Sequence, residues 1–313
     1  MSRSIEFTLH PERVCKRNRC LGVPHEYLNL IERDTLYRSG ELDVTYDIPL
    51  NQNDPLTAEL GDQVRIAIST EVTYYSFNLI KPPFDNIDLR RALTLAIDRE
   101  VLQGKIVKGG AIPSYSYAGR IDPDYKGPLI AEATMSQADC EVLARELYAK
   151  AGFGPDNVLH LAITSTVAED HVRLAQGVAL MWKKVLGAEA TVIKMEVKAW
   201  LDTFHAGGWD VFGDNVIGVF PGPETYLSYL RPSAKSGYNW VKPEYDAAMD
   251  VAAAISDKAS RYRELAKAEK IFLDDYVVSP IAVEPLRHLV APHVKGWDKS
   301  VIGYHNSQWM TLE

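Results

Sequence analysis

The sequence predicts an α/β protein whose strands form a mixed sheet. Runs of β-branched and aromatic residues alternate along the chain with segments that carry apolar residues at helical spacing, and this alternation is typical of a sheet covered by helices. Glycine, proline and Asx residues separate the two kinds of segment. The expected strands are residues 72–77, 158–164, 191–195, 209–212 and 277–282, and the expected helices lie between them and at 244–255 and 257–276.

Length and charge narrow the class of protein. The chain has 313 residues, of which 46% are apolar and 24% charged, enough to bury one large core or two lobes. Its 34 Lys and Arg residues against 42 Asp and Glu residues give a net charge of −8, which disfavours nucleic acid or an anionic membrane as a partner because both need a basic surface. It has no run of about 18 apolar residues, the length that predicts a membrane-spanning helix.

The N-terminal region has few features of its own. The first twenty residues contain neither the apolar core nor the cleavage site of an export signal, so we expect a mature or truncated chain. Cys15, Cys20 and Cys140 are an odd number, so at least one is unpaired or pairs between molecules, and the spacing of the first two is a poor zinc motif. Gly40 is expected to end a helix, and residues 42–46 to form the strand that follows.

Residues 72–100 predict a strand, a turn and a helix. Residues 72–77 suit a half-buried pleated surface, and Pro82-Pro83 ends the strand because prolines supply no amide hydrogen. Asp85 or Asp88 is expected to cap the helix. Apolar residues at helical spacing would face the core, and charged ones would mark the wetter face. The apolar set is Ala92, Leu93, Ala96 and Ile97, and the charged set is Arg90, Arg91, Asp98 and Arg99.

This segment, KPPFDNIDLRRALTLAIDRE at residues 81–100, resembles the signature of extracytoplasmic solute-binding protein family 5, the oligopeptide-, dipeptide- and nickel-binding proteins of ABC importers. RSGELD at residues 38–43 resembles a second family segment. The resemblance implies a periplasmic-binding-protein-like fold of type II (cluster C), of which this chain would be the C-terminal portion. It also implies a partial first lobe at 1–71, a complete α/β ligand-binding lobe at 72–282 and a return to the first lobe at 283–313.

The remaining elements follow from local signals. Ser136 with Asp139 is a capping-box variant that opens a helix closing at Gly152. Residues 170–186 place an apolar stripe on one helix face, and Gly187 stops that helix. We interpret the stripe as core; it consists of Leu174, Val178, Met181, Trp182 and Val185.

No catalytic signature is present: the sequence lacks G-x-S-x-G, H-E-x-x-H, a Walker loop and G-x-G-x-x-G. The adjacent Glu169, Asp170 and His171 suggest a metal cluster, but adjacent residues on a helix point in different directions. We interpret them as a solvated helix cap, with ligand contact as the alternative, and expect neither a metal nor a cofactor.

The candidate ligand-binding residues rest mainly on the resemblance. It aligns His171 with a histidine that oligopeptide binders direct toward peptide carboxylates, and His205 with a pocket histidine. Residues 212–225 would form the ligand loop. Where the family has an aromatic residue and an aspartate that pairs with the ligand's α-ammonium, this chain has Val216 and Val219; Phe204 and Gly213 replace basic residues. Asp214 would supply an anion only from a site shifted from the family's aspartate position. The loop therefore predicts either a more apolar ligand or the loss of ligand binding. The full candidate set is Tyr74, Tyr75, Tyr115, Tyr117, His171, His205, Asp214, Val216, Ile217, Val219 and Tyr238.

Three functions are weighed. The first is the substrate-binding component of an ABC-type peptide importer: periplasmic and monomeric, it would bind short peptides or another small molecule in a cleft between lobes and deliver them to the permease. The second is a ligand-sensing domain of a larger transcriptional regulator, which an upstream helix-turn-helix segment would favour. The third, a peptidase using Glu169, Asp170 and His171, is disfavoured by the missing catalytic motif.

Overall fold

The computed structural model describes residues 14–16, 19–21, 30–45, 47–48, 52–119, 122–231, 238, 240–297, 305 and 309–313. The chain divides into two compact units. Unit 1 is Met1–Ser69 with Pro285–Glu313, and unit 2 is Thr70–Glu284. The two boundaries fall within the long strands β3 (Val64–Phe77) and β8 (Val278–Leu289).

Unit 1 contains short elements around a small apolar cluster of Tyr37, Ile48, Leu56 and Leu289. Its helices are α1 (Leu30–Arg38), α2 (Asn53–Leu60) and the 3₁₀ turn η3 (Gly61–Gln63). Its antiparallel pairs join β1 (Val14–Lys16) to β2 (Arg19–Leu21), and β9 (Val294–Lys295) to β10 (Thr311–Leu312). Gly40, with φ +71°, follows α1 as predicted.

The strand expected at residues 42–46 is wrong. Val44 forms only an isolated bridge with Val290, and single backbone bonds on either side, from Thr45 N to Leu289 O and from Ala291 N to Asp43 O, complete the contact. Tyr46 and most of the predicted return segment after Gly296 lie outside the described residues, as do the side chains of Cys15 and Cys20. Cys140 is a free, buried thiol.

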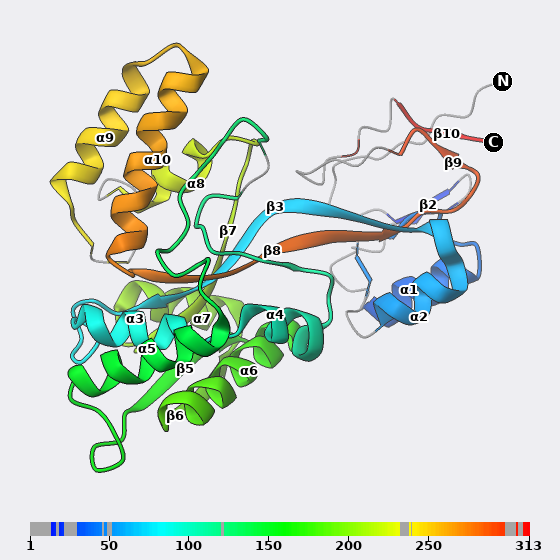
Figure 1. The fold of residues 1–313 in the computed structure, drawn as a ribbon. Helices are drawn as coiled ribbons and strands as arrows, with labels where there is room; N and C mark the ends of the chain where they lie inside the picture. Colours follow the sequence, from blue (N-terminus) through cyan, green and yellow to red (C-terminus); the bar gives the residue numbers. More distant parts are fainter. Residues whose placement is uncertain are drawn as a thin grey trace. The chain divides into compact units, whose positions relative to one another are not determined.

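Unit 2 is built on the mixed sheet that the sequence predicts. The strand order is β4-β8-β3-β7-β5-β6 (Figure 1). Strand β7 pairs antiparallel with β3 and parallel with β5, and β5 pairs parallel with β6. The bounds are β4 (Ile112–Pro113), β5 (His160–Thr166), β6 (Glu189–Met195) and β7 (Val211–Ile217).

Two crossover helices cover the parallel part of this sheet. Helix α6 (Glu169–Leu186) leads from β5 outward to β6, and α7 (Val197–Ala206) leads from β6 back across β5 to β7. Because such crossovers are right-handed, the two helices lie on opposite faces of the sheet. The predicted stripe of α6 is buried, and Gly187 ends α6 in the left-handed conformation (φ +73°). Both predictions are confirmed.

The signature helix is α3 (Ile87–Leu95), and its charged residues do not lie where the pattern placed them. The N-cap is Asn86, whose side chain accepts from Asp88 N, rather than Asp85 or Asp88. Arg90 and Arg99 are 6% and 3% exposed, so the predicted wet face is wrong for both.

The buried arginines bond to backbone carbonyls. Arg90 donates to Phe84 O, Asp85 O, Asp275 O and Tyr276 O. Arg99, in α4 (Arg99–Val101), donates to Pro280 O at 2.7 Å. The planar guanidinium, which carries five N–H donors, suits donation to several carbonyls at once. The signature arginines thus join α3 and α4 to the end of α10 (Lys258–Asp274) and the start of β8.

The remaining helices of unit 2 lie around this framework. Ser136 caps α5 (Gln137–Lys150) by accepting from Asp139 N, as predicted. Helices α9 (Pro243–Ala254) and α10 pack side by side (Figure 1). Shorter turns are η4 (Leu102–Val107), α8 (Glu224–Leu227) and η5 (Ser228–Leu230).

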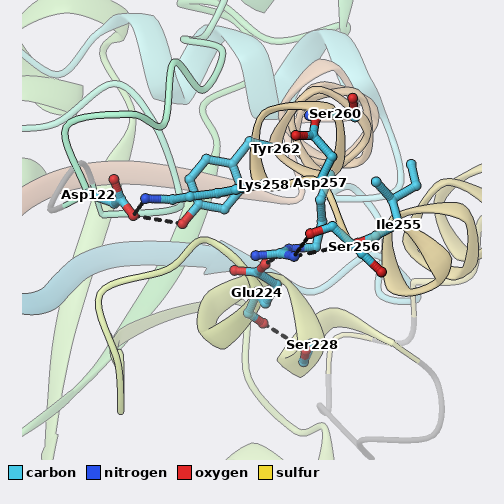
Figure 2. A network of polar contacts seen from close by, with 10 residues as sticks. Asp122, Glu224, Ser228, Ile255, Ser256, Asp257, Lys258, Ser260 and Tyr262 are labelled. Atoms are coloured by element: carbon cyan, nitrogen blue, oxygen red, sulfur yellow. Dashed lines mark hydrogen bonds and ion pairs between the residues drawn. The ribbon is translucent and has the colours of Figure 1, made fainter.

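A polar network fixes the start of α10 (Figure 2). Asp257 caps the helix by accepting from Ser260 N. Lys258 Nζ and Tyr262 Oη lie 2.8 and 2.7 Å from Asp122 Oδ2, and the hydrogen bond from Lys258 is the main reason that the pKa of Asp122 falls to about 2. Arg261 pairs with Glu224 of α8 at 2.8 Å. The network ties α10 to α8 and to the segment that follows Tyr117.

Candidate functional site

The antiparallel ladder between β3 and β7 positions two of the four predicted residues that the structure brings together. Its register places Tyr74 opposite Asp214 and Tyr75 opposite Gly213. Because side chains alternate along a strand, Tyr74 and Asp214 share one sheet face with Ser76 and Phe212, and Tyr75 points to the other face. Tyr117 and Tyr238 complete the group: the Tyr74 ring lies 5.3 Å from that of Tyr117 and 6.5 Å from that of Tyr238. We call Tyr74, Tyr117, Tyr238 and Asp214 the tyrosine–aspartate cluster.

The hydroxyls of this cluster form a directed chain. Tyr74 Oη lies 3.0 Å from Asp214 Oδ2 and 2.5 Å from Tyr238 Oη. A phenol has one proton to donate, and the ionised carboxylate only accepts, so Tyr74 donates to Asp214 and accepts from Tyr238. The rings are almost fully buried, with exposed fractions of 2%, 0% and 4% for Tyr74, Tyr117 and Tyr238, whereas Asp214 is partly exposed.

Two further hydroxyls lie deeper in the cluster. The Tyr117 Oη and Ser76 Oγ atoms are buried and make no hydrogen bond within the described part of the chain. The two hydroxyls nevertheless lie close enough to the Tyr238 phenol to lower its pKa slightly against the larger effect of burial. They therefore lie near Tyr238 but outside hydrogen-bonding geometry. The hydroxyl groups and the carboxylate of the cluster therefore lie together among aromatic rings.

Burial controls the protonation of the carboxylate. It raises the pKa of Asp214 from 3.8 to about 6, against the opposing effects of the hydrogen bonds from Asn215 N and Tyr74 Oη and of the nearby His171. Burial also raises the pKa of Tyr74 and Tyr238 well above their ordinary values. Asp214 is thus mostly ionised at neutral pH and becomes protonated in mildly acidic solution.

Aromatic side chains of α7 frame the same sheet face. Trp200 and Phe204 lie one turn apart, with ring centroids 4.8 and 4.9 Å from that of Phe212. Phe204 also packs against Tyr238 at 5.7 Å, and Trp200 Nε1 donates to Gly213 O at 3.2 Å. The sequence pattern did not single out Trp200 or Ser76, although Trp200 precedes Phe204 by four helical residues and Ser76 follows Tyr74 by two strand residues.

The other predicted residues lie outside the cluster. Tyr75 is buried against Gly213, where an added Cβ would come within 3.0 Å of its ring. Tyr115 lies beneath the Arg99 guanidinium at 4.9 Å. His171 Nδ1 contacts Thr166 Oγ1 at 2.8 Å, and the exposed His205 contacts Leu201 O within its own helix.

Two local predictions in this region are wrong. Residues 212–217 of the predicted ligand loop belong to β7, so only 218–223 connect β7 to α8. At the end of β7, Val216 is buried and Ile217 is 54% exposed, and Val219 in the connection that follows is 65% exposed. The N-cap of α6 is Ala168 without a side-chain cap, so Glu169, Asp170 and His171 do not form the expected cap.

The described residues also bear on whether the chain has a metal site, a membrane span or a groove elsewhere. They contain no group of His, Cys, Asp and Glu suited to hold a metal ion, and no described helix is long and apolar enough to cross a membrane. A groove of about 740 Å³ runs between α6 and β6, but none of the candidate ligand-binding residues lines it.

Comparison with known sequences settles the family. The family description "Bacterial extracellular solute-binding proteins, family 5 Middle" matches residues 30–238. The chain belongs to this family. Its members include the periplasmic oligopeptide-binding protein OppA of Salmonella typhimurium, which is 31% identical over 266 residues, and the periplasmic murein peptide-binding protein MppA of Escherichia coli, which is 28% identical over 262 residues. Both alignments cover 83% of this chain but only 48% and 49% of those proteins.

Solved structures of the family share the fold. The murein tripeptide-binding protein MppA of Escherichia coli has a TM-score of 0.82 at 26% identity, covering 89% of this chain and 55% of that one. Haemophilus influenzae OppA in complex with the peptide RPPGFSPFR has a TM-score of 0.81 at 27% identity, covering 93% and 57%. The periplasmic-binding-protein-like fold is confirmed. The chain spans about half the length of the relatives that it matches.

Proposed function

We propose that this chain is part of the substrate-binding component of an ABC-type importer and binds short peptides or related small molecules outside the inner membrane. The observation that carries the proposal is the family match over residues 30–238. Relatives with the same fold are named for oligopeptides and murein peptides. A relative of Escherichia coli, 28% identical over 276 residues, is named a probable deoxycholate-binding periplasmic protein, which is why small molecules other than peptides stay within the proposal.

Within this proposal, residues 72–282 form the ligand-binding lobe. The partly exposed Asp214, Trp200 and Phe204 face the ligand, and the buried Tyr74, Tyr117 and Tyr238 support them from the core. Tyrosine and tryptophan combine apolar area with one hydrogen bond each, which suits recognition that tolerates different side chains. Delivery to a permease, a periplasmic location and a monomeric state belong to the same proposal. His171 is proposed to meet a ligand carboxylate, and His205 to form a hydrogen bond with an end of the peptide. Val216, Ile217 and Val219 give this region its apolar character.

A thermal melt with and without a pool of short peptides tests the proposal. A ligand that binds only the folded state, present at about 100 times its dissociation constant, adds roughly 2.7 kcal/mol of stability. A concentration-dependent rise in the midpoint supports peptide binding. A cooperative melt that no peptide shifts, up to millimolar concentration, contradicts it for this chain.

A further inference from the structure

Exposed apolar side chains gather where three neighbouring strands of unit 2 end. Strands β6, β5 and β7 lie side by side in the sheet and run parallel. Val167 follows β5, Val197 opens α7 after β6, and Ile217 ends β7. Val219 and Phe220 come next, in the connection from β7 to α8. These side chains are 44% to 65% exposed, and we call the five residues the apolar platform.

Backbone pairing brings the parts of the platform close together. Val167 N donates to Met195 O at 3.1 Å, and Met195 is the last residue of β6, just before Val197. Thr164 of β5 pairs with Phe212 of β7, so the residues after β5 lie beside the last residues of β7. Neighbouring strands are about 4.8 Å apart, so the three strand ends span about 10 Å.

The amino ends of the same strands carry charges instead. His160 begins β5 and Glu189 begins β6, and their side chains lie 3.3 Å apart. Asp210, which immediately precedes β7, pairs with Lys81. The three strands thus begin at charged residues and end at apolar ones. Ligands of open α/β sheets bind outside the carboxyl ends of the strands, and clustered exposed apolar side chains mark binding surfaces.

The charges around the platform disfavour an anionic ligand. Glu71 pairs across the ladder with the last residue of β7, and Glu196 separates β6 from α7. Lys194 of β6 lines the groove beside α6. Two cations of the adjoining helices are paired within those helices, Arg173 with Glu169 in α6 and Lys198 with Asp202 in α7. A carboxylate on the ligand would meet like charges here, whereas an uncharged apolar group would not.

We propose that the apolar platform binds uncharged apolar side chains of a peptide and makes the protein selective for hydrophobic peptides. This inference rests on the proposed function and names the ligand class of that site. It adds Val167 and Val197, which the sequence pattern did not single out, to the predicted Ile217 and Val219. Each platform side chain already exposes apolar surface to water, so a ligand that covers it gains the hydrophobic free energy without displacing the core.

Calorimetric titration with three tripeptides at pH 7.5 tests the platform. Trileucine, triserine and triglutamate share a backbone and termini and differ only in their side chains. We expect trileucine to bind about tenfold more tightly than triserine, and triglutamate to bind most weakly. A double variant, Val197→Ser with Val219→Ser, should reduce the preference for trileucine over triserine about threefold. The matched control, Val142→Ser with Val251→Ser, changes two exposed valines of α5 and α9 and should keep the preference.

The outcomes separate the two proposals. Triserine or triglutamate that binds the wild-type protein as tightly as trileucine overturns the apolar platform and leaves peptide binding intact. An unchanged preference in the Val197→Ser and Val219→Ser variant, or an equal loss in the control variant, does the same. Failure of all three tripeptides and of the peptide pool to bind overturns the proposed function, and the platform with it.

Discussion

Replacing Asp214 with asparagine is expected to stabilise the folded protein at neutral pH. Burial raises the pKa of Asp214 from 3.8 to about 6, so the folded state holds this proton more tightly than the unfolded chain does. The resulting penalty is fully present above pH 6 and disappears below pH 3.8. About two pKa units correspond to about 3 kcal/mol. Because the side chain is partly exposed, solvent screening reduces the expected gain to about 1–2 kcal/mol.

Asparagine fits the site after the hydrogen-bond chain reverses. Its oxygen can accept from Asn215 N, and the Tyr74 hydroxyl can rotate to accept from the new amide and donate to Tyr238. Both bonds replace contacts that the structure already contains. The Tyr238 proton then turns toward the nearby Ser76 and Tyr117 hydroxyls. The substitution therefore removes the charge while keeping the local packing.

Urea unfolding of the wild-type protein and Asp214→Asn at pH 7.5 and pH 5.0 measures this effect, provided that the two proteins have equal m-values. Linkage predicts that the gain at pH 5.0 is roughly half of that at pH 7.5. Asp202→Asn, at an exposed position, should change neither. A variant less stable than the wild type at pH 7.5, or a gain that is the same at both pH values, refutes the argument.

Three further substitutions test the framework of unit 2. Glu269→Gln should lower the free energy of unfolding in urea by about 2 kcal/mol, because this fully buried carboxylate accepts two backbone amides and the Tyr125 hydroxyl; a loss below about 0.5 kcal/mol would contradict the assigned role. Arg99→Lys should cost about 3 kcal/mol by the same measurement, because an ammonium cannot reach Pro280 O and its other buried acceptors together, and an unchanged midpoint would show that these bonds contribute nothing. Gly187→Ala should lower stability by about 1 kcal/mol through φ +73° alone, since nothing lies within 4 Å of the added Cβ; no loss would exclude backbone strain at this helix end.

Short sequence patterns correctly predicted where α5 begins, where α6 ends and which face of α6 is buried. The Ser136 cap, the Gly187 stop and the apolar stripe of α6 each follow from a few neighbouring residues. The arginines of the signature could not be placed in this way. Arg90 and Arg99 were predicted to lie on a solvent-exposed face, but three of their carbonyl acceptors, Asp275 O, Tyr276 O and Pro280 O, lie 181 to 186 residues away in the chain. Only tertiary structure brings those carbonyls to them.

The site was predictable in composition but not in geometry. Tyr74, Tyr117, Tyr238 and Asp214 were all singled out, yet their convergence depends on the register that sets Tyr74 opposite Asp214. The family resemblance assigned residues 212–225 to a ligand loop between a strand that ends at Phe212 and a helix, so residues 212–217 were expected outside the sheet. The structure extends β7 through them, because β3 is long enough to pair with every residue from Val211 to Ile217.

The surroundings of Asp214 differ from those of a second carboxylate in the same lobe. A carboxylate that burial makes difficult to ionise, and that accepts hydrogen bonds from the neutral Tyr74 Oη and Asn215 N, lowers the stability of the folded protein at neutral pH. Glu132 is instead paired with Arg91, so its charge is compensated within the lobe. Removing the Asp214 charge should therefore raise the free energy of unfolding, whereas removing the Glu132 charge should lower it because Arg91 loses that partner.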